Sequence, residues 1–230
     1  MTPKIRVIIP AYNEQESIGK VIAEIPEIVS EVIVVSNNSS DKTEMVAKNA
    51  GATVLKEDQK GYGYACLLGM NHIAKTAPDT DIVVFLDGDY SDYPEELLLL
   101  IKPIIEDKVD MVIGARVAHL RLPNSMTPQQ VFGNWLATFL MKIFFGAKFT
   151  DLGPFRAIKY QKLLDLNMED KTYGWTVEMQ LKALKQNLSY VEVPVRYRKR
   201  IGVSKVSGTI KGTIMAGVKI LGWIFKYSFK

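Results

Sequence analysis

The chain has 230 residues, of which 47% are hydrophobic and 23% are charged. This balance is typical of a globular protein that buries a sizeable core, and it excludes disorder, collagen and coiled coil. The length favours one domain, or one domain with an appendage. The net charge is only +4, and no uncharged apolar run approaches the roughly 20 residues of a membrane-spanning helix.

Cysteine and histidine are scarce, which limits the chemistry of any site. Cys66 is the only cysteine and cannot form an intramolecular disulfide, while His72 and His119 are the only histidines. Zinc sites made of His and Cys and a Ser-His-Asp hydrolase are therefore disfavoured, so any metal should be held by carboxylates. The N-terminus lacks the basic and apolar segments of a secretory signal, so we expect a reducing, cytoplasmic environment.

Short apolar and β-branched runs alternate with helical patterns in the first half of the chain. Five runs are predicted to be strands: residues 5–10, 32–35, 53–55, 82–86 and 111–115. Asp41 and Glu44 have the spacing of a capping box that opens a helix, which Gly51 closes. Because residues 82–86 are apolar throughout, we expect an α/β fold with a mostly parallel sheet flanked by helices. Ligands of such sheets bind beyond the carboxyl ends of the strands.

The pattern changes after residue 115. Prolines and polar residues predict a loop over 122–128. Residues 131–149 then form an apolar segment. Helical spacing predicts a helix over 175–185, and alternating residues predict a strand over 190–197. A last helix begins at about residue 208.

The C-terminal region is electrostatically distinct. It has nine basic residues and no acid from Arg196 to Lys230, which leaves a net charge of −5 in residues 1–195. We predict one domain over residues 1–207 and an amphipathic helix over 208–230. The helix carries apolar and basic positions on different sides: Ile210, Ile214, Val218, Leu221 and Phe225 against Lys211, Lys219 and Lys226. Such a helix could lie on a membrane or pack on its own domain, and its charge could face nucleic acid, anionic lipid or a phosphorylated ligand.

Common nucleotide-binding motifs are incomplete or missing from the sequence. Residues 61–63 read Gly-Tyr-Gly and begin like a dinucleotide fingerprint, but Cys66 stands at the third glycine position and the segment does not follow the first strand. The sequence also lacks a P-loop lysine motif and a nucleophile elbow. An NAD enzyme, a Walker-type ATPase and an α/β-hydrolase are therefore disfavoured.

An acidic motif, Asp87-Gly88-Asp89, follows the strand predicted over residues 82–86. Two carboxylates at the tip of a buried strand can bind a hard divalent cation, and the glycine between them lets a diphosphate approach closely. The alternative interpretation is a solvated acidic turn before the next helix. The motif alone does not decide between them.

Three segments taken together resemble a known family. Residues 7–14 read Val-Ile-Ile-Pro-Ala-Tyr-Asn-Glu, residues 36–41 read Ser-Asn-Asn-Ser-Ser-Asp, and residues 87–89 read Asp-Gly-Asp. In order and spacing they resemble the family 2 glycosyltransferases, which have a nucleotide-sugar-binding GT-A fold. Further motifs resemble the dolichyl- and polyprenyl-phosphate sugar synthase branch of that family: Gly133-Asn134 and residues 151–156, 173–179, 193–195 and 200–205.

The resemblance covers nearly the whole chain and implies an inverting, metal-dependent transfer of a hexose from a UDP- or GDP-linked sugar to a polyprenyl phosphate. Two alternatives stay open: transfer to a hydroxyl of a glycolipid or small molecule, and a non-catalytic module that binds nucleotide sugar or lipid phosphate. The implied partners are the donor, the lipid-phosphate acceptor and the cytoplasmic face of a membrane, with no role for nucleic acid. The apolar segment 131–149 and the helix from Ile210 are the candidates for contact with the lipid acceptor. Ser36 and Asn37 replace aspartates that are common in the family, so the identity of the donor base stays open. The oligomeric state also stays open.

The resemblance also implies binding roles for individual residues. Asp87 and Asp89 would hold magnesium or manganese (Mg²⁺ or Mn²⁺) against the donor diphosphate. The nucleotide would contact nine residues: Pro10, Ala11, Tyr12, Glu14, Asn37, Lys60, Gly61, Asp87 and Gly88. Phosphate groups would be bound by four: Arg116, Arg200, Ser204 and Lys205.

Catalysis would involve Asp89, Asp151 and Glu178. A hydroxyl acceptor requires a general base, and Asp151 or Glu178 could serve. A polyprenyl phosphate is already ionised at neutral pH and requires none, so Asp151 would then orient the sugar or the metal. We expect the second case because the motifs of the second half resemble the lipid-phosphate branch.

Overall fold

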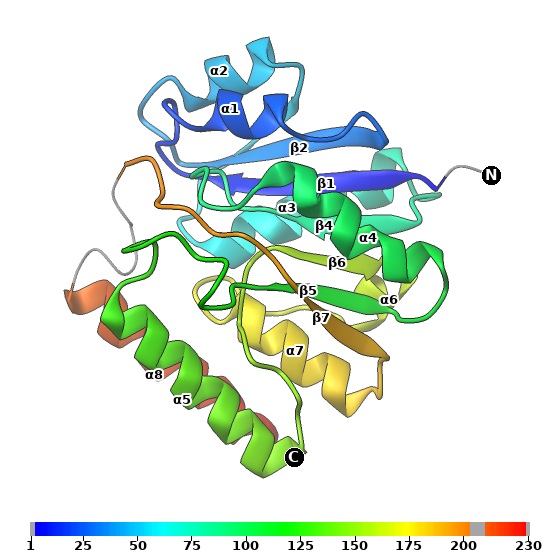
Figure 1. Cartoon of the computed structure of the whole chain (residues 1–230). Helices are drawn as coiled ribbons and strands as arrows, with labels where there is room; N and C mark the ends of the chain where they lie inside the picture. Colours follow the sequence, from blue (N-terminus) through cyan, green and yellow to red (C-terminus); the bar gives the residue numbers. More distant parts are fainter. Residues whose placement is uncertain (1–2, 203–209, 229–230) are drawn as a thin grey trace.

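The computed structural model describes residues 3–202 and 210–228, in which strands and helices alternate along most of the chain (Figure 1). The strands are β1 (Ile5–Ala11), β2 (Val29–Asn37), β3 (Thr53–Glu57), β4 (Ile82–Phe85), β5 (Met111–Ala115), β6 (Arg156–Lys159) and β7 (Tyr190–Pro194). The helices are α1 (Ile18–Ala23), α2 (Thr43–Asn49), α3 (Tyr62–Thr76), α4 (Leu97–Ile105), α5 (Pro128–Phe145), α6 (Tyr160–Asp165), α7 (Trp175–Lys185) and α8 (Ile210–Ser228), with a 3-10 turn at Pro94–Glu96.

The strands form one seven-stranded sheet in the order β3-β2-β1-β4-β6-β5-β7. Its pairs are parallel except where β6 runs antiparallel to β4 and to β5. The expected mostly parallel sheet is therefore confirmed, and each of the strands expected in the first half is present. Strand β6 was not predicted, because it has only four residues and begins and ends with a cation.

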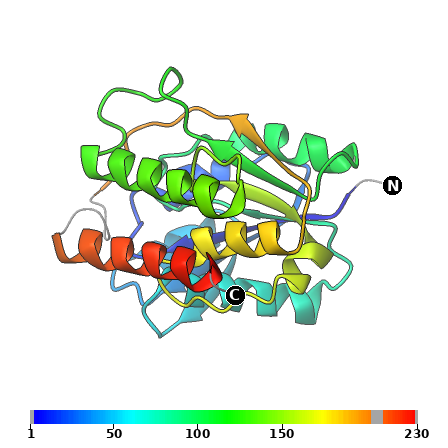
Figure 2. The same ribbon diagram turned by 90° about the horizontal axis from the view of Figure 1, so that it is seen from below.

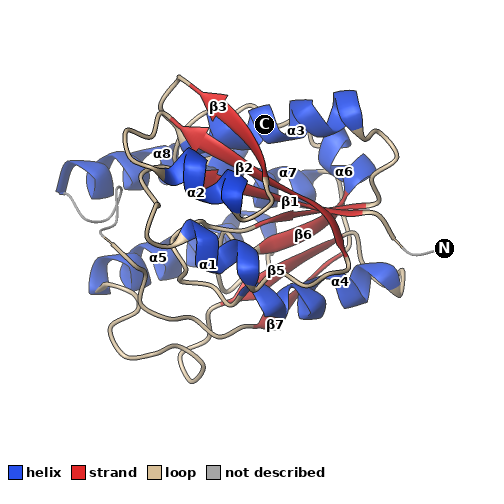
Figure 3. Cartoon of the chain, turned by 90° about the horizontal axis from the view of Figure 1, so that it is seen from above, coloured by secondary structure: helices blue, strands red, loops and turns tan. Residues whose placement is uncertain are grey.

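Helices cover both faces of the sheet (Figure 3). Side chains of α1, α2 and α4 form the core on one face, and those of α3, α5, α6, α7 and α8 form the core on the other. All four residues of β4 are buried between these layers, as its continuous apolar run predicts. The acidic motif after β4 thus starts from the centre of the sheet.

Local signals explain where two helices begin. In α5 the Thr127 hydroxyl accepts the N–H of Gln130 at 3.2 Å, and the Gln130 side chain accepts the N–H of Thr127 at 2.8 Å, which together form a capping box. The capping box predicted for α2 is wrong. Asp41 does accept the N–H of Thr43, but Glu44 accepts the hydroxyl of Ser36 at 2.9 Å, because the end of β2 lies within its reach.

The C-terminal helix α8 packs on the domain and lies beside α5 and α7 (Figure 2). Trp223 and Ile224 are buried in the core that α7 also lines, whereas Ile214 and Val218 are exposed. The predicted division between residues 207 and 208 falls outside the described residues and stays a prediction. Among residues 3–202 and 210–228, no helix has the length and apolar character to cross a membrane.

Candidate active site

A cavity of about 760 Å³ opens at the carboxyl ends of β1, β2 and β4 and extends between α5 and α8. These three strands are adjacent and parallel, so the turns that follow them meet at one edge of the sheet. All nine residues expected to contact the nucleotide line the cavity, together with Asp89, Arg116 and Arg200. Their contacts with a ligand stay a prediction.

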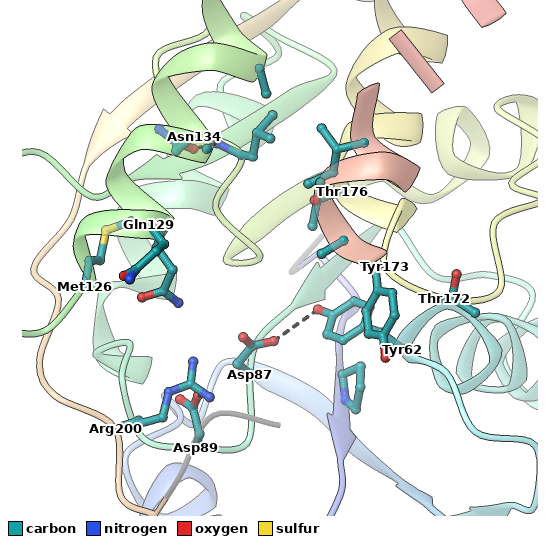
Figure 4. A pocket seen from close by; sticks show the side chains of 18 of the residues that line it. Tyr62, Asp87, Asp89, Met126, Gln129, Asn134, Thr172, Tyr173, Thr176 and Arg200 are labelled. Carbon is teal, nitrogen blue, oxygen red and sulfur yellow. Dashed lines mark hydrogen bonds and ion pairs between the residues drawn. The ribbon is translucent and has the colours of Figure 1, made fainter. Parts of the chain in front are cut away.

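The acidic motif lies at the centre of the cavity wall (Figure 4). Asp87 accepts the hydroxyl of Tyr62 at 3.1 Å. Desolvation in the cavity wall and the negative charge of Asp89 raise the pKa of Asp87 to about 6, although the charge of Arg200 opposes this shift. The two carboxylates therefore repel each other in a partly buried position, which is a setting that a bound cation would stabilise.

Arg200 reaches this motif because two segments far apart in the sequence run side by side. The N–H of Arg198 donates to the carbonyl of Ser91 at 2.8 Å, and the N–H of Ile201 donates to the carbonyl of Asp89 at 2.9 Å. Arg200 consequently lies 2.8 Å from Asp89, measured from Nη1 to Oδ2. Ser204 and Lys205, the other two residues expected to bind phosphate in this region, lie outside the described residues.

Arg116 follows β5 and is held by Asp151. The carboxylate of Asp151 accepts the backbone N–H of Arg116 at 2.7 Å and two guanidinium N–H groups at 2.8 and 2.6 Å. Burial favours the neutral acid, but the positive charge and hydrogen bonds of Arg116 outweigh it and lower the pKa of Asp151. Arg116 lines the cavity and Asp151 does not. The carboxylate of Asp151 thus holds the arginine, and the role expected for Asp151 toward sugar or metal stays a prediction.

Glu178 is not at the cavity, in contrast to the expectation that it could act as a base. It is fully buried, accepts the N–H groups of Glu169 and Asp170 at 2.8 and 2.7 Å, and pairs with Lys182 at 2.8 Å. These contacts occupy its carboxylate inside the protein, and its expected role in catalysis stays a prediction. The sequence motif that contains Glu178 does not reveal in which direction its side chain points.

Asn37 shapes the nucleotide end of the cavity. Its side-chain oxygen accepts the N–H of Gly61 at 2.8 Å, and its NH₂ group donates to the carbonyl of Gln59 at 2.7 Å. One amide hydrogen and one lone pair remain for a ligand. A Cβ atom at position 61 would lie 2.1 Å from the carbonyl oxygen of Lys171, so only glycine permits this close approach.

The sequence interpretation missed several residues that line the cavity. Tyr62 is the hydrogen-bond partner of Asp87, and its only signal is its position directly after Gly61. At the far end, the sequence pointed to the segments 131–149 and from Ile210 as candidates for contact with a lipid acceptor, but it did not single out the residues that line the cavity there: Gln129, Phe132 and Leu136 of α5, and Ala216, Gly217, Ile220 and Leu221 of α8. The apolar spacing of these helices was recognisable, but not their facing arrangement around one cavity.

Comparisons with known proteins agree with this fold. The family model for Glycosyl transferase family 2 matches residues 6–166. A dolichyl-phosphate hexose transferase from Haloferax volcanii is 32% identical over 208 residues, covering 88% of this chain and 86% of the relative. An undecaprenyl-phosphate mannosyltransferase from Micrococcus luteus is 31% identical over 231 residues, covering 94% and 92%.

The chain is also similar to a solved structure, that of glucosyl-3-phosphoglycerate synthase from Mycobacterium tuberculosis, with a TM-score of 0.77 and 20% identity. That protein was crystallised with Mn²⁺, UDP and glucosyl-3-phosphoglycerate. The alignment covers 99% of this chain and 80% of that one. The fold is thus that of the GT-A glycosyltransferases. Together with the sequence matches, this shows that the chain belongs to glycosyltransferase family 2 and is a glycosyltransferase.

Proposed function

We propose that this enzyme transfers a hexose, with inversion, from a UDP- or GDP-linked sugar to a polyprenyl phosphate at a membrane surface. The observation that carries the proposal is the shape of the cavity. Its charged end contains Asp87, Asp89 and Arg200, and its other end runs between two helices with exposed apolar side chains, α5 and α8. A charged head group joined to an apolar chain fits this combination. The two relatives named for lipid phosphates support the same acceptor class.

Asp87 and Asp89 are the residues proposed to hold Mg²⁺ or Mn²⁺. Carboxylate oxygens are the ligands that these hard cations prefer, and the mutual repulsion of the two side chains favours a bound cation. The described residues contain no cluster of three or more His, Cys, Asp or Glu suited to a metal, so the donor diphosphate and water would complete the shell. The cation would stabilise the charge that develops on the departing nucleotide.

The chain's own cations would orient the phosphates. Arg116, fixed by Asp151, and Arg200, beside Asp89, both line the cavity and can donate charge-assisted hydrogen bonds. An acceptor phosphate oxygen would attack the anomeric carbon as the bond from that carbon to the donor phosphate breaks, which releases UDP or GDP. The attacking oxygen is already ionised, so this transfer requires no general base.

The exposed apolar side chains form a stripe on each helix. The α5 stripe comprises Phe132, Trp135, Phe139 and Ile143, and the α8 stripe comprises Ile214, Met215, Val218 and Phe225. The exposed fraction reaches 60% at Phe132 and 64% at Val218. The two helices lie side by side (Figures 1 and 2), and Phe144 meets Phe225 with ring centroids 5.9 Å apart. Exposed apolar surface of this extent is suited to insertion into a membrane interface.

A hydroxyl acceptor is less well supported by the site. It would require a general base, but Asp151 is paired with Arg116 and Glu178 is buried away from the cavity. The solved glucosyl-3-phosphoglycerate synthase is similar at 20% identity, which supports the shared fold and not a shared acceptor. A non-catalytic module would retain nucleotide binding without transfer, so a measurement of turnover separates it from the enzyme.

The test uses the full chain in detergent with radiolabelled UDP-glucose or GDP-mannose, Mn²⁺, and undecaprenyl or dolichyl phosphate. We expect label in the organic extract, and its loss with EDTA or in the Asp89→Ala variant. Asp79→Ala is the matched control, because Asp79 is an exposed acid on the loop before β4. Label transferred only to hydroxyl acceptors would refute the proposed acceptor. Nucleotide binding without any transfer would refute catalysis.

A further inference from the structure

Residues 169–174, which precede α7, pack against the donor end of the cavity. The N–H of Gly63 donates to the carbonyl of Thr172 at 3.3 Å, and the N–H of Tyr64 donates to the carbonyl of Lys171 at 3.1 Å. The contact is so close that a Cβ atom on Gly63 would lie 2.0 Å from the carbonyl oxygen of Asp170. The first turn of α3, which follows the cavity-lining Gly61, therefore rests directly on this segment.

The same segment holds α8 through Asp170, which is only 2% exposed. One oxygen of Asp170 accepts the N–H groups of Thr172 and Gly174 at 2.7 and 3.0 Å. The other accepts the indole N–H of Trp223 at 2.7 Å and lies 3.2 Å from the ammonium of Lys219. Trp223 and Lys219 both belong to α8. The single carboxylate thus joins the backbone beside the cavity to the C-terminal helix.

We propose that Asp170 is a positioning residue that couples the seating of α8 to nucleotide binding at the opposite end of the cavity. This inference rests on the proposed function, in which α8 contacts the membrane and the acceptor. Displacement of α8 would remove two of the four partners of this carboxylate, Trp223 and Lys219, and so destabilise the segment on which the first turn of α3 rests. The coupling is reciprocal, because two sites that bias one arrangement must affect each other equally.

The contacts on either side define the expected path of this coupling. Thr172 and Tyr173 line the cavity themselves, and Tyr62, in the supported turn of α3, donates to the expected metal ligand Asp87. Glu178 anchors the segment from α7 by accepting the N–H groups of Glu169 and Asp170. A membrane that fixes α8 therefore stabilises the cavity in the arrangement that binds nucleotide.

The experiment measures the affinity of the full chain for UDP and GDP with Mn²⁺ by calorimetry, alone and with vesicles of phosphatidylglycerol and phosphatidylcholine. For the wild type we expect vesicles to tighten nucleotide binding about fivefold or more, the lower end of usual coupling. Asp170→Asn keeps the size of the side chain but can turn an NH₂ group toward Trp223 and Lys219. We expect weaker nucleotide binding and no vesicle effect in this variant.

Two further variants keep the test decisive if Asp170→Asn does not fold. In Gly174→Ala the added Cβ would lie 2.4 Å from the indole nitrogen of Trp223, which forces the ring away from Asp170. Trp223→Phe removes the indole donor and part of the ring volume but keeps an aromatic side chain in the core. Glu27→Gln is the control, since Glu27 is exposed and its neighbours Ile25 and Ile28 pack in the core on the other face of the sheet from α8. The control should behave as wild type.

Wild-type nucleotide affinity that vesicles do not change, or variants that retain the full vesicle effect, would overturn the coupling. If the vesicles do not bind to the protein, the coupling is tested by amide hydrogen exchange of α8. Nucleotide with Mn²⁺ should slow the exchange of the α8 amides in the wild type and not in Gly174→Ala. Unchanged exchange in the wild type would also overturn it. None of these readings uses a polyprenyl phosphate, so failure of the coupling is distinguishable from failure of the proposed acceptor.

Discussion

Arg200 donates to Asp89 across 2.8 Å, which places a cation expected to bind phosphate directly against an expected metal ligand. The pair neutralises part of the acidic motif in the free protein, since burial and the charge of Asp89 raise the pKa of Asp87 and the charge of Arg200 opposes that rise. A donor diphosphate would bring its own negative charge to the same place. The arginine can then turn from the carboxylate to the phosphate without leaving the cavity.

We expect Arg200→Gln to weaken the binding of UDP or GDP with Mn²⁺ about tenfold or more, because a hydrogen bond to a charged group contributes about 1.5–3 kcal/mol. Calorimetry on the purified variant measures the change. Arg196→Gln is the control, since Arg196 pairs with Glu95 and Glu96 at the surface and does not line the cavity. Equal affinities in the Arg200 variant and the wild type would contradict the assigned role.

Asp151→Asn should lower both stability and activity, because it removes the partner of Arg116, whose side chain is mostly buried. Breaking one side of a buried ion pair costs about 3–5 kcal/mol in the free energy of unfolding. Urea denaturation near neutral pH measures this difference, and the transfer assay measures activity. An activity loss much larger than that of an Arg116→Gln variant would instead indicate a direct role for Asp151 in transfer.

The pH dependence of the same pair has a defined sign. Arg116 lowers the pKa of Asp151 in the folded state, so the stabilising effect is fully present above the ordinary pKa of about 3.9. This stabilisation is lost as the pH falls through the lowered pKa that Asp151 has in the folded state. The stability difference between wild type and Asp151→Asn should therefore be constant at neutral pH and shrink below about pH 4. A difference that grows on acidification would contradict the assignment.

The acceptor end can be blocked selectively at two glycines. Gly133 of α5 and Gly217 of α8 line the cavity, and a Cβ atom on either would meet open space. We expect Gly133→Leu and Gly217→Leu to raise the KM for polyprenyl phosphate while nucleotide affinity is retained. Stability should be unchanged or higher, because leucine favours a helix over glycine by about 0.8 kcal/mol.

Gly222→Leu provides the control for these substitutions. Gly222 also lies on α8 with open space around it, but it does not line the cavity. The KM of the Gly222→Leu variant for polyprenyl phosphate should match that of the wild type. If the two cavity variants keep the wild-type KM as well, the acceptor chain does not run between α5 and α8.

The apolar stripes predict binding to membranes. Replacing Trp135 and Phe139 of α5 by serine should sharply reduce recovery of the protein with anionic vesicles in a flotation assay, because it removes two exposed aromatic side chains. Leu98→Ser with Leu99→Ser is the control, since these leucines are each 47% exposed but lie on α4, on the other face of the sheet. Equal losses in both double variants would indicate non-specific adsorption.

Local patterns in the sequence predict the strands and the position of the acidic motif. The continuous apolar run before Asp87 predicts a strand buried on both faces, and adjacent parallel strands bring the turns after β1, β2 and β4 to one edge. The cavity lining expected around Asp87 follows from these two facts. Alternation and helical spacing need only neighbouring residues, which is why they can be recognised in one chain.

Contacts between side chains far apart in the sequence became visible with the packing of the whole domain. Asp151 pairs with Arg116, Glu178 points to the backbone of residues 169–170, and Asn37 binds the segment before α3 rather than being fully free for a base. The antiparallel insertion of β6 and the placement of α8 beside α5 are of the same kind. Such contacts depend on how complete elements pack and on which buried polar groups need partners, and no periodicity in the sequence specifies these partners.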